Sequence, residues 1–197
     1  MTHGPQQKKR PAVQIQPTTL PEVLILTPRR FGDARGWFCE TWNAETLARA
    51  GLDLAFVQDN HSYSAPRHTL RGLHFQRPPR AQDKLVRCTR GVILDVAVDV
   101  RRGSPRYGLV AAVELSAENG QQLLVPKGFL HGFLTLTPDC EVQYKCTDSY
   151  APECDGAVRW DSIGFDWGTS DPVLSAKDAV AGALADFDTP FTYEGAA

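Results

Sequence analysis

The sequence lacks the features that mark several special classes of protein. It has no run of about 18 apolar residues, which excludes a transmembrane helix. Its 21 basic and 23 acidic residues give a formal net charge of −2, so no overall charge favours nucleic acid or a membrane surface. Its 5 cysteines form an odd set without a CxxC pair or zinc-finger spacing, which is typical of reduced thiols in a cytoplasm. These absences predict a cytoplasmic globular protein.

The length predicts one domain. A chain of 197 residues can bury a core of its own. Residues 1–19 contain a Lys-Lys-Arg run but no apolar stretch of a secretory signal, so we expect a flexible leader there. Residues 20–190 are expected to form a single domain that ends in a helical tail, followed by a short tail over 191–197.

Short strand-like segments dominate the pattern. They are separated by Gly, Pro, Asn and Asp, and they cover 23–26, 37–40, 55–60, 84–90, 92–100, 109–115, 121–125, 132–136 and 141–147. Intervals of roughly 8–12 residues between strands are typical of an all-β sandwich or jelly roll rather than of βαβ units. We therefore expect an all-β fold, with residues 62–67 in a loop.

Residues 92–100 have the clearest strand pattern. Their even positions are all apolar, whereas the odd positions include Asp95 and Asp99. This period of two predicts a strand with one dry face and one partly polar face. Both aspartates remain without an assigned role.

Two short helices are expected outside the strands. Asn43 can cap a helix over 44–50 that Gly51 ends. An alanine-rich stretch over 175–187 is typical of a short amphipathic helix.

A PxGxxH motif over 126–131 resembles the second motif of the cupin family of small jelly-roll barrels. Metal-binding cupins carry an HxH in their first motif, but here the corresponding place is His74-Phe75-Gln76. A transition-metal site needs three or more ligands, and only His74 and His131 are available. We therefore expect a cupin-type jelly-roll barrel without a metal.

A longer comparison is more specific than either motif. Nine segments in order together resemble the dTDP-4-dehydrorhamnose 3,5-epimerase family over residues 20–190. They are FGDARGWF (31–38), FVQDNHS (56–62), LRGLHFQ (70–76), KLVRCTRG (84–91), DVAVDVRRGSP (95–105), VELSAEN (113–119), VPKGFLHGF (125–133), YKCTDSYAPE (144–153) and LSAKD (174–178). The segment over 159–167 is shorter than the corresponding segment of the family. This departure from the family pattern bears on the shape of the sugar pocket.

The resemblance implies a cofactor-independent isomerase that inverts C3 and C5 of dTDP-4-dehydro-6-deoxy-D-glucose. It implies that His74 is the base, that Asp178 orients it, and that Tyr144 is the acid on the opposite face. Lys84 and Arg71 would stabilise the enolate.

The resemblance also implies contacts to the substrate and a homodimer, in which the Arg35 of one subunit reaches the site of the other. An arginine fork suits phosphate oxygens. Besides Arg71 and Lys84, the implied contacts are Arg35, Gln58, Asn60, His131 and Lys177, with Glu153 or Asp155 as a weaker acidic candidate.

Several alternatives stay open at this point. Asp178 lies three residues after Ser175 and fits a capping box as well as a catalytic role. His74 alone fits a structural histidine, and Tyr144 fits a core aromatic residue. A 3- or 5-monoepimerase on a related keto-sugar, a metal-dependent cupin and a non-catalytic sugar-binding jelly roll are the other functions considered.

Overall fold

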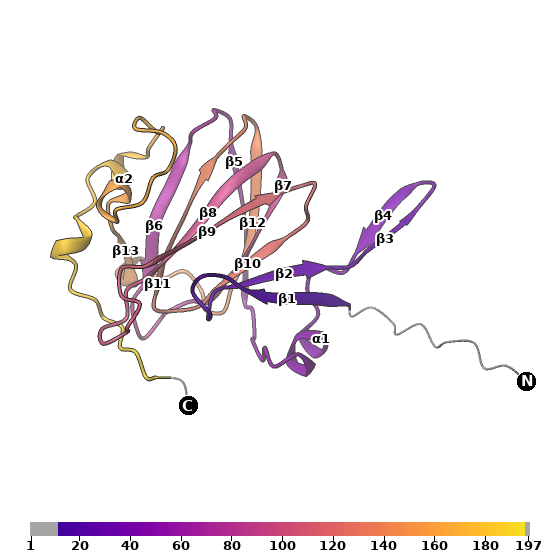
Figure 1. The fold of residues 1–197 in the computed structure, drawn as a ribbon, viewed down its shortest axis with the longest axis horizontal. Coiled ribbons are helices and arrows are strands. Elements are labelled where there is room, and N and C mark those ends of the chain that lie inside the picture. The colour runs from indigo at the N-terminus through magenta and orange to yellow at the C-terminus, as the bar shows by residue number, and fades with distance from the viewer. Residues whose placement is uncertain (1–11, 196–197) are drawn as a thin grey trace, which may run out of the picture.

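The computed structural model describes residues 12–195, which form two facing antiparallel sheets (Figure 1). Sheet A contains six strands in the order β1 (Val13–Pro17), β2 (Leu24–Pro28), β10 (Gln122–Val125), β7 (Lys84–Arg90), β12 (Cys140–Cys146) and β5 (Gln58–Ser64). Sheet B contains five, in the order β13 (Asp155–Ala157), β6 (Leu70–Gln76), β11 (Phe129–Thr135), β8 (Val92–Asp99) and β9 (Val110–Ser116). The predicted all-β jelly roll is confirmed.

A separate two-stranded hairpin projects from this barrel. It consists of β3 (Arg30–Asp33) and β4 (Gly36–Cys39), and Figure 1 shows it on the side opposite the C-terminal segment. Its side chains Phe31, Trp37 and Phe38 are at least half exposed. Such aromatic exposure on a projecting element is typical of an interaction surface.

The helices are few and short. They are α1 (Ala44–Arg49), α2 (Ala176–Ala179) and the 3₁₀ turns η1 (Pro152–Cys154), η2 (Trp160–Ser162) and η3 (Leu184–Asp186). The predicted cap is confirmed, since Asn43 accepts a hydrogen bond from the Thr46 backbone. Within residues 12–195, no helix has the length and apolar character that a membrane crossing requires.

Three sequence-based boundaries are wrong. The expected leader includes β1, which pairs with β2 over five residues, although residues 1–11 lie outside the described part. The expected loop over 62–67 begins only after Ser64, because β5 continues its pairing with β12 to that residue. At the other end, the expected tail over 191–197 begins with the buried Phe191, and the Tyr193 backbone bonds to Arg102.

The expected helix over 175–187 is also wrong in extent. It stops at Ala179, and Gly182 instead accepts a backbone hydrogen bond from Arg159 at 2.7 Å. Tertiary pairing of this glycine therefore overrides a favourable local composition.

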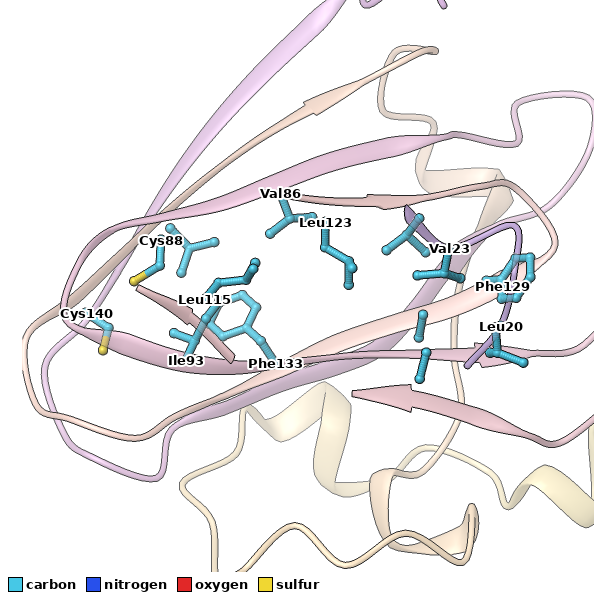
Figure 2. Packing of buried hydrophobic residues seen from close by; sticks show 14 residues of the cluster. Leu20, Val23, Val86, Cys88, Ile93, Leu115, Leu123, Phe129, Phe133 and Cys140 are labelled. Carbon is cyan, nitrogen blue, oxygen red and sulfur yellow. The ribbon is translucent and has the colours of Figure 1, made fainter. Parts of the chain in front are cut away.

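The main core lies between the two sheets. Figure 2 shows Val86 and Leu123 of sheet A facing Ile93 and Phe133 of sheet B. All four are at most 4% exposed, so this half of the barrel interior is dry.

A second apolar cluster covers the outer face of sheet B. Val96 and Val98 of β8 pack there against the C-terminal segment, including Trp167 and Phe191. Both faces of β8 are thus buried, and the predicted partly polar face lies inside the barrel. Asp95 and Asp99 on that face are 0% exposed, so each needs a partner.

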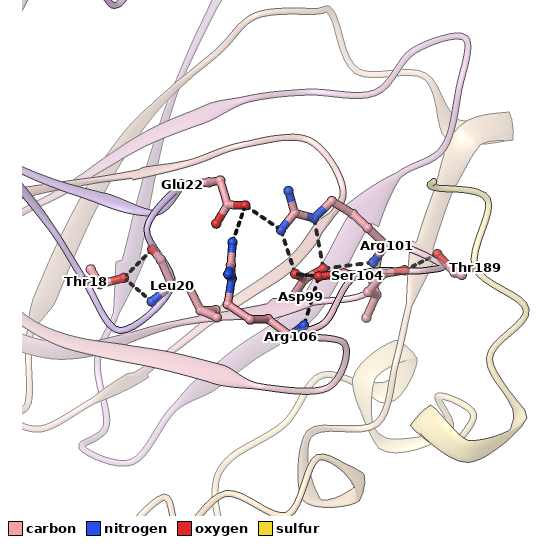
Figure 3. A network of polar contacts seen from close by, with 9 residues as sticks. Thr18, Leu20, Glu22, Asp99, Arg101, Ser104, Arg106 and Thr189 are labelled. Carbon is pink, nitrogen blue, oxygen red and sulfur yellow. Dashed lines mark hydrogen bonds and ion pairs between the residues drawn. The ribbon is translucent and has the colours of Figure 1, made fainter. Parts of the chain in front are cut away.

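Asp99 finds its partners in the turn after β8 (Figure 3). Its carboxylate accepts hydrogen bonds from Arg101 Nη2 at 2.6 Å and from Ser104 Oγ at 2.7 Å. Glu22 in turn bridges Arg101 and Arg106, at 3.0 Å from each. Burial opposes ionisation of Asp99, but its bonds to Arg101 and Ser104 outweigh it and lower the pKa of this carboxyl.

We predict that Asp99→Ala destabilises the fold by about 3–5 kcal/mol, because it leaves Arg101 as a largely buried charge without its main partner. Urea unfolding followed by tryptophan fluorescence measures this change. Asp188→Asn is the control, since the ion pair of Asp188 with Arg102 is exposed on both sides. Equal stability of Asp99→Ala and the control would contradict the assigned importance of the network.

Candidate active site

A cavity of about 220 Å³ lies between the sheets. Sheet A lines it through β5, β7 and β12, and sheet B through β6 and β11, with α2 at one side. The lining residues are Ser62, Arg71, His74, Lys84, His131, Phe133, Tyr144, Ser175, Lys177 and Asp178. All five predicted catalytic residues therefore meet in one cavity.

A larger cavity of about 620 Å³ is lined by Arg101, Arg106 and Phe191 among others. Its two arginines are already paired with Glu22, and Arg101 with Asp99 as well. The smaller cavity is therefore the better candidate for an active site.

His74 and Asp178 form a short polar contact in the smaller cavity. The Nε2 atom of His74 lies 2.6 Å from Oδ1 of Asp178, which is only 3% exposed. Donation from Nε2 leaves Nδ1 with its lone pair, the form that a general base requires. Burial raises the pKa of Asp178, but the bond and charge of His74, Ser175 and the Gly72 backbone together lower it below its usual value.

Ser175 is the N-cap residue of α2. The Ser175 hydroxyl accepts a hydrogen bond from the Asp178 backbone at 3.1 Å. This leaves the Asp178 carboxylate for His74. The contact of the Asp178 carboxylate with His74 is the geometry that the catalytic alternative expects.

A second imidazole and carboxylate pair lies deeper in the barrel. The Nε2 atom of His131 is 2.7 Å from Oδ1 of Asp95, and both residues are buried. The other carboxylate oxygen of Asp95 has no hydrogen-bond partner within residues 12–195. Sequence reasoning left Asp95 unassigned, and its position on the polar face of an otherwise apolar strand was the available signal.

Tyr144 faces His74 from the opposite sheet. Tyr144 belongs to β12 of sheet A and packs against the main core, whereas His74 belongs to β6 of sheet B. Burial raises the pKa of Tyr144, so its phenol keeps its proton at neutral pH. The cavity thus presents a base on one wall and a proton donor on the other.

Lys84 and Arg71 also line the cavity. Burial lowers the pKa of Lys84, and the nearby Cys146, Asp155 and Asp95 oppose this shift. Arg71 is held by Ser64 Oγ at 3.1 Å and by the Tyr63 carbonyl at 2.9 Å. Arg71 therefore has a defined position before a ligand binds, and Lys84 lines the same cavity.

A close approach of β6 and β11 supports the site. A Cβ atom on Gly132 would lie 2.8 Å from the Arg71 carbonyl, so only glycine fits. The backbones that carry His74 and His131 therefore pack in direct contact, as their register pairing also shows.

The remaining predicted contacts lie outside this cavity. Arg35 is in the projecting hairpin, with its side chain 89% exposed and paired to Asp33. Gln58 and Asn60 of β5 bond to each other at 3.0 Å. Glu153 is exposed, while Asp155 is an ion-pair partner of Lys177.

Gln76 stands where metal-binding cupins have the second histidine of the HxH motif, and its side chain makes hydrogen bonds to the backbone instead. Its side chain bonds to the Arg80 and Ser149 carbonyls and to the Ala151 backbone. In the described part of the chain, no three His, Cys, Asp or Glu residues gather as metal ligands.

We predict that Asp178→Asn reduces stability at pH 7 by about 1–3 kcal/mol, since it removes a charge-assisted hydrogen bond. A carboxyl group with a lowered folded-state pKa stabilises the protein above its unfolded pKa of about 3.9 and loses this contribution as pH falls through the folded value. The stability difference from wild type should therefore shrink below about pH 4. Urea unfolding between pH 3 and pH 8 checks this, and a difference that grows towards low pH would contradict it.

Comparison with known proteins identifies the family. A family model described as dTDP-4-dehydrorhamnose 3,5-epimerase matches residues 17–186. The dTDP-4-dehydrorhamnose 3,5-epimerase of Salmonella typhimurium is 51% identical, with 85% of this chain and 93% of the relative covered.

Two solved structures agree with this match. The dTDP-4-dehydrorhamnose 3,5-epimerase of Bacillus anthracis, with TDP and PPi bound, is 44% identical with a TM-score of 0.85, over 88% of this chain and 100% of that one. The Legionella pneumophila dTDP-6-deoxy-D-glucose-3,5-epimerase, in complex with dTDP-4-keto-L-rhamnose, is 40% identical with a TM-score of 0.88, over 93% and 100%. The chain therefore belongs to the dTDP-4-dehydrorhamnose 3,5-epimerase family and is an isomerase with a cupin-type jelly-roll fold.

Proposed function

We propose that this isomerase inverts C3 and C5 of dTDP-4-dehydro-6-deoxy-D-glucose and so forms dTDP-4-dehydro-L-rhamnose, with His74 as base and Tyr144 as acid. The observation that carries these roles is the placement of His74, bonded to Asp178, across one cavity from the protonated Tyr144. Inversion needs a proton removed from one face of the sugar and returned to the other. Groups on two facing sheets meet that need.

The first step is proton removal at C5. The C4 ketone acidifies the neighbouring hydrogens, and Nδ1 of His74 takes one of them while the C–H electron pair moves to the C4 oxygen. Asp178 stabilises the resulting imidazolium. Lys84 and Arg71 place positive charge near the enolate oxygen, and such preorganised charge is often the largest catalytic effect.

The second step returns a proton from the other side. Tyr144 donates its hydroxyl proton to C5 and the enolate returns to the ketone. Solvent then restores the proton of Tyr144 and removes the one on His74. The same exchange at C3 completes the double inversion.

The nucleotide half of the substrate needs contacts besides those of the catalytic residues. We assign Gln58, Asn60 and His131 to the nucleotide and Lys177 to its phosphates. Glu153 and Asp155 both stay candidates for the acidic contact, and Asp155 lies beside the cavity as the ion-pair partner of Lys177.

Arg35 serves a second subunit in this proposal. The hairpin that carries it projects away from α2 and the cavity beside it (Figure 1), so Arg35 is badly placed for its own site. The exposed aromatic residues of the hairpin also need a partner surface. A homodimer satisfies both requirements.

We also place the enzyme in the cytoplasm and treat residues 13–193 as one domain. All five cysteines are free thiols, which suits a reducing compartment. Strand β1 and the segment around Phe191 both pack against the barrel.

Incubation with dTDP-4-keto-6-deoxyglucose in D₂O, followed by NMR, tests the reaction and the roles together. Wild type should incorporate deuterium at both C3 and C5. His74→Ala should slow exchange by about 10²–10⁴-fold, because the base is lost. Tyr144→Phe should retain part of the exchange but fail to invert the carbons, since solvent returns the proton only to the face of His74.

Two matched controls belong to this experiment. His61→Ala removes an exposed histidine on the outer face of β5, and Tyr107→Phe alters an exposed tyrosine, so both should behave as wild type. Deuterium at a single carbon would identify a monoepimerase. No exchange by folded wild type would overturn the proposal, and identical complete loss in His74→Ala and Tyr144→Phe would contradict their separate roles.

The dimer proposal predicts a dimeric mass in light scattering and a KM that rises about 10–100-fold in Arg35→Ala, because a charge-assisted phosphate contact is lost. Arg49→Ala, in the exposed last turn of α1, is the control. Co-expression of Arg35→Ala with His74→Ala should restore part of the activity, since mixed dimers contain one complete site. A fully active monomer, or no recovery in mixed dimers, would refute the shared site.

A further inference from the structure

The hairpin of β3 and β4 lies outside both sheets of the barrel. Among the strands of residues 12–195, β3 and β4 pair only with each other, so neither sheet A nor sheet B continues into them. An isolated two-stranded hairpin is at best marginally stable in water. Its orientation therefore needs a tether besides the two chain connections at its base.

Arg30 supplies a tether of this kind. Its guanidinium donates from Nη1 to the Glu118 carbonyl at 2.5 Å and from Nη2 to the Ala117 carbonyl at 2.6 Å. Both carbonyls belong to the turn that joins β9 to β10. The central carbon of the same guanidinium lies 4.3 Å from the centre of the Trp37 ring in β4. Arg30 thus joins the hairpin to the barrel through two charge-assisted hydrogen bonds and one cation–π contact.

The turn between β9 and β10 is held by its own hydrogen bonds. The Asn119 side chain accepts from the backbone N–H groups of Ser116 at 3.1 Å and Gln121 at 3.0 Å. A Cβ atom on Gly120 would lie 2.6 Å from Nη2 of Arg30, so any larger residue there would displace the guanidinium. The turn is therefore a fixed anchor that leaves room for Arg30.

The two faces of the hairpin differ in their surroundings. Side chains alternate across a strand, so Arg30 and Trp37 lie on the face that meets the β9–β10 turn, and the paired Phe31 and Phe38 lie on the other face. Phe31 is 50% exposed and Phe38 is 68% exposed. One face is thus fastened to the hairpin's own barrel, while the exposed aromatic face stays available to a second subunit.

We propose that Arg30 is a positioning residue of the shared active site, which holds the hairpin against the β9–β10 turn so that Arg35 reaches the site of the other subunit. The proposal rests on the homodimer and on the role of Arg35 given above. Strands of four residues span about 13 Å, so a tilt of about 10° at the base moves the hairpin tip by about 2 Å. A charge-assisted hydrogen bond tolerates only a smaller shift.

The test measures KM and kcat for dTDP-4-keto-6-deoxyglucose from deuterium exchange at C5. Arg30→Met keeps an apolar stem over Trp37 but loses both donors. Its KM should rise about 5–50-fold while kcat changes less than about threefold, because the catalytic residues are intact and a charge-assisted substrate contact is weakened. Arg30→Lys, with one ammonium in place of the planar fork, should have a KM between those of wild type and Arg30→Met.

Arg49→Met is the matched control and should keep the wild-type KM. Arg49 also donates to a backbone carbonyl, that of Glu45 at 3.1 Å, but it lies in the last turn of α1 and is exposed. Light scattering and thermal unfolding check that each variant is a folded dimer. If Arg30→Met is not, Arg30→Lys decides the question, and a wild-type KM in Arg30→Lys would then overturn the positioning role.

Mixed dimers, isolated with two affinity tags, separate an effect on the partner's site from damage to the variant's own chain. Arg30→Met on one chain and His74→Ala on the other leave one site with both an intact base and an intact hairpin, so the KM should be that of wild type. Both substitutions on one chain, paired with a wild-type chain, leave the working site with the altered hairpin, so the KM should stay raised. Equal KM values in the two mixed dimers, or the reverse order, would overturn the positioning role.

Failure of this proposal is distinguishable from failure of the shared site. A raised KM in Arg35→Ala together with a wild-type KM in Arg30→Met would overturn the positioning role alone. A wild-type KM in Arg35→Ala, or a fully active monomer, would instead overturn the shared site on which the proposal rests.

Discussion

The hydrogen bond between His74 and Asp178 is the contact on which the rest of the site depends. It joins residues 104 positions apart, from β6 next to the edge of sheet B and from the four-residue helix α2. Neither partner is useful alone, because the imidazole needs an orienting acceptor and the buried carboxylate needs a donor. The cap at Ser175 and the backbone hydrogen bonds of Val173 and Gly182 hold the segment that carries Asp178 against sheet B.

The barrel interior tolerates charge because its carboxylates are paired. Asp95 bonds to His131, and Asp99 bonds to Arg101 and Ser104, although both aspartates are fully buried. Outside the active-site cavity, apolar side chains fill the space between the sheets (Figure 2), so water does not compete there. The same low polarity keeps Tyr144 protonated and makes nearby cations more effective.

Rules that read the local sequence succeeded for features that neighbouring residues determine. The β7 boundaries, the Asn43 cap and the alternation of β8 follow from strand pattern and side-chain chemistry. The active-site set followed from family resemblance, since no spacing rule links residues 74, 144 and 178. The rules failed where tertiary pairing decides: β1 needs β2, β5 extends against β12, and Gly182 stops a helix by bonding to Arg159. Asp95 was missed because its partner lies 36 residues away.

The central claim is that His74 and Tyr144 approach the sugar from opposite faces within one cavity. A crystal structure with bound dTDP-4-keto-L-rhamnose tests it most directly. We predict that C5 lies between Nδ1 of His74 and the Tyr144 hydroxyl oxygen, about 3–4 Å from each, with Lys84 and Arg71 at the C4 oxygen. A sugar with both side chains on one face, or a sugar bound in the larger cavity near Arg101, would contradict the account.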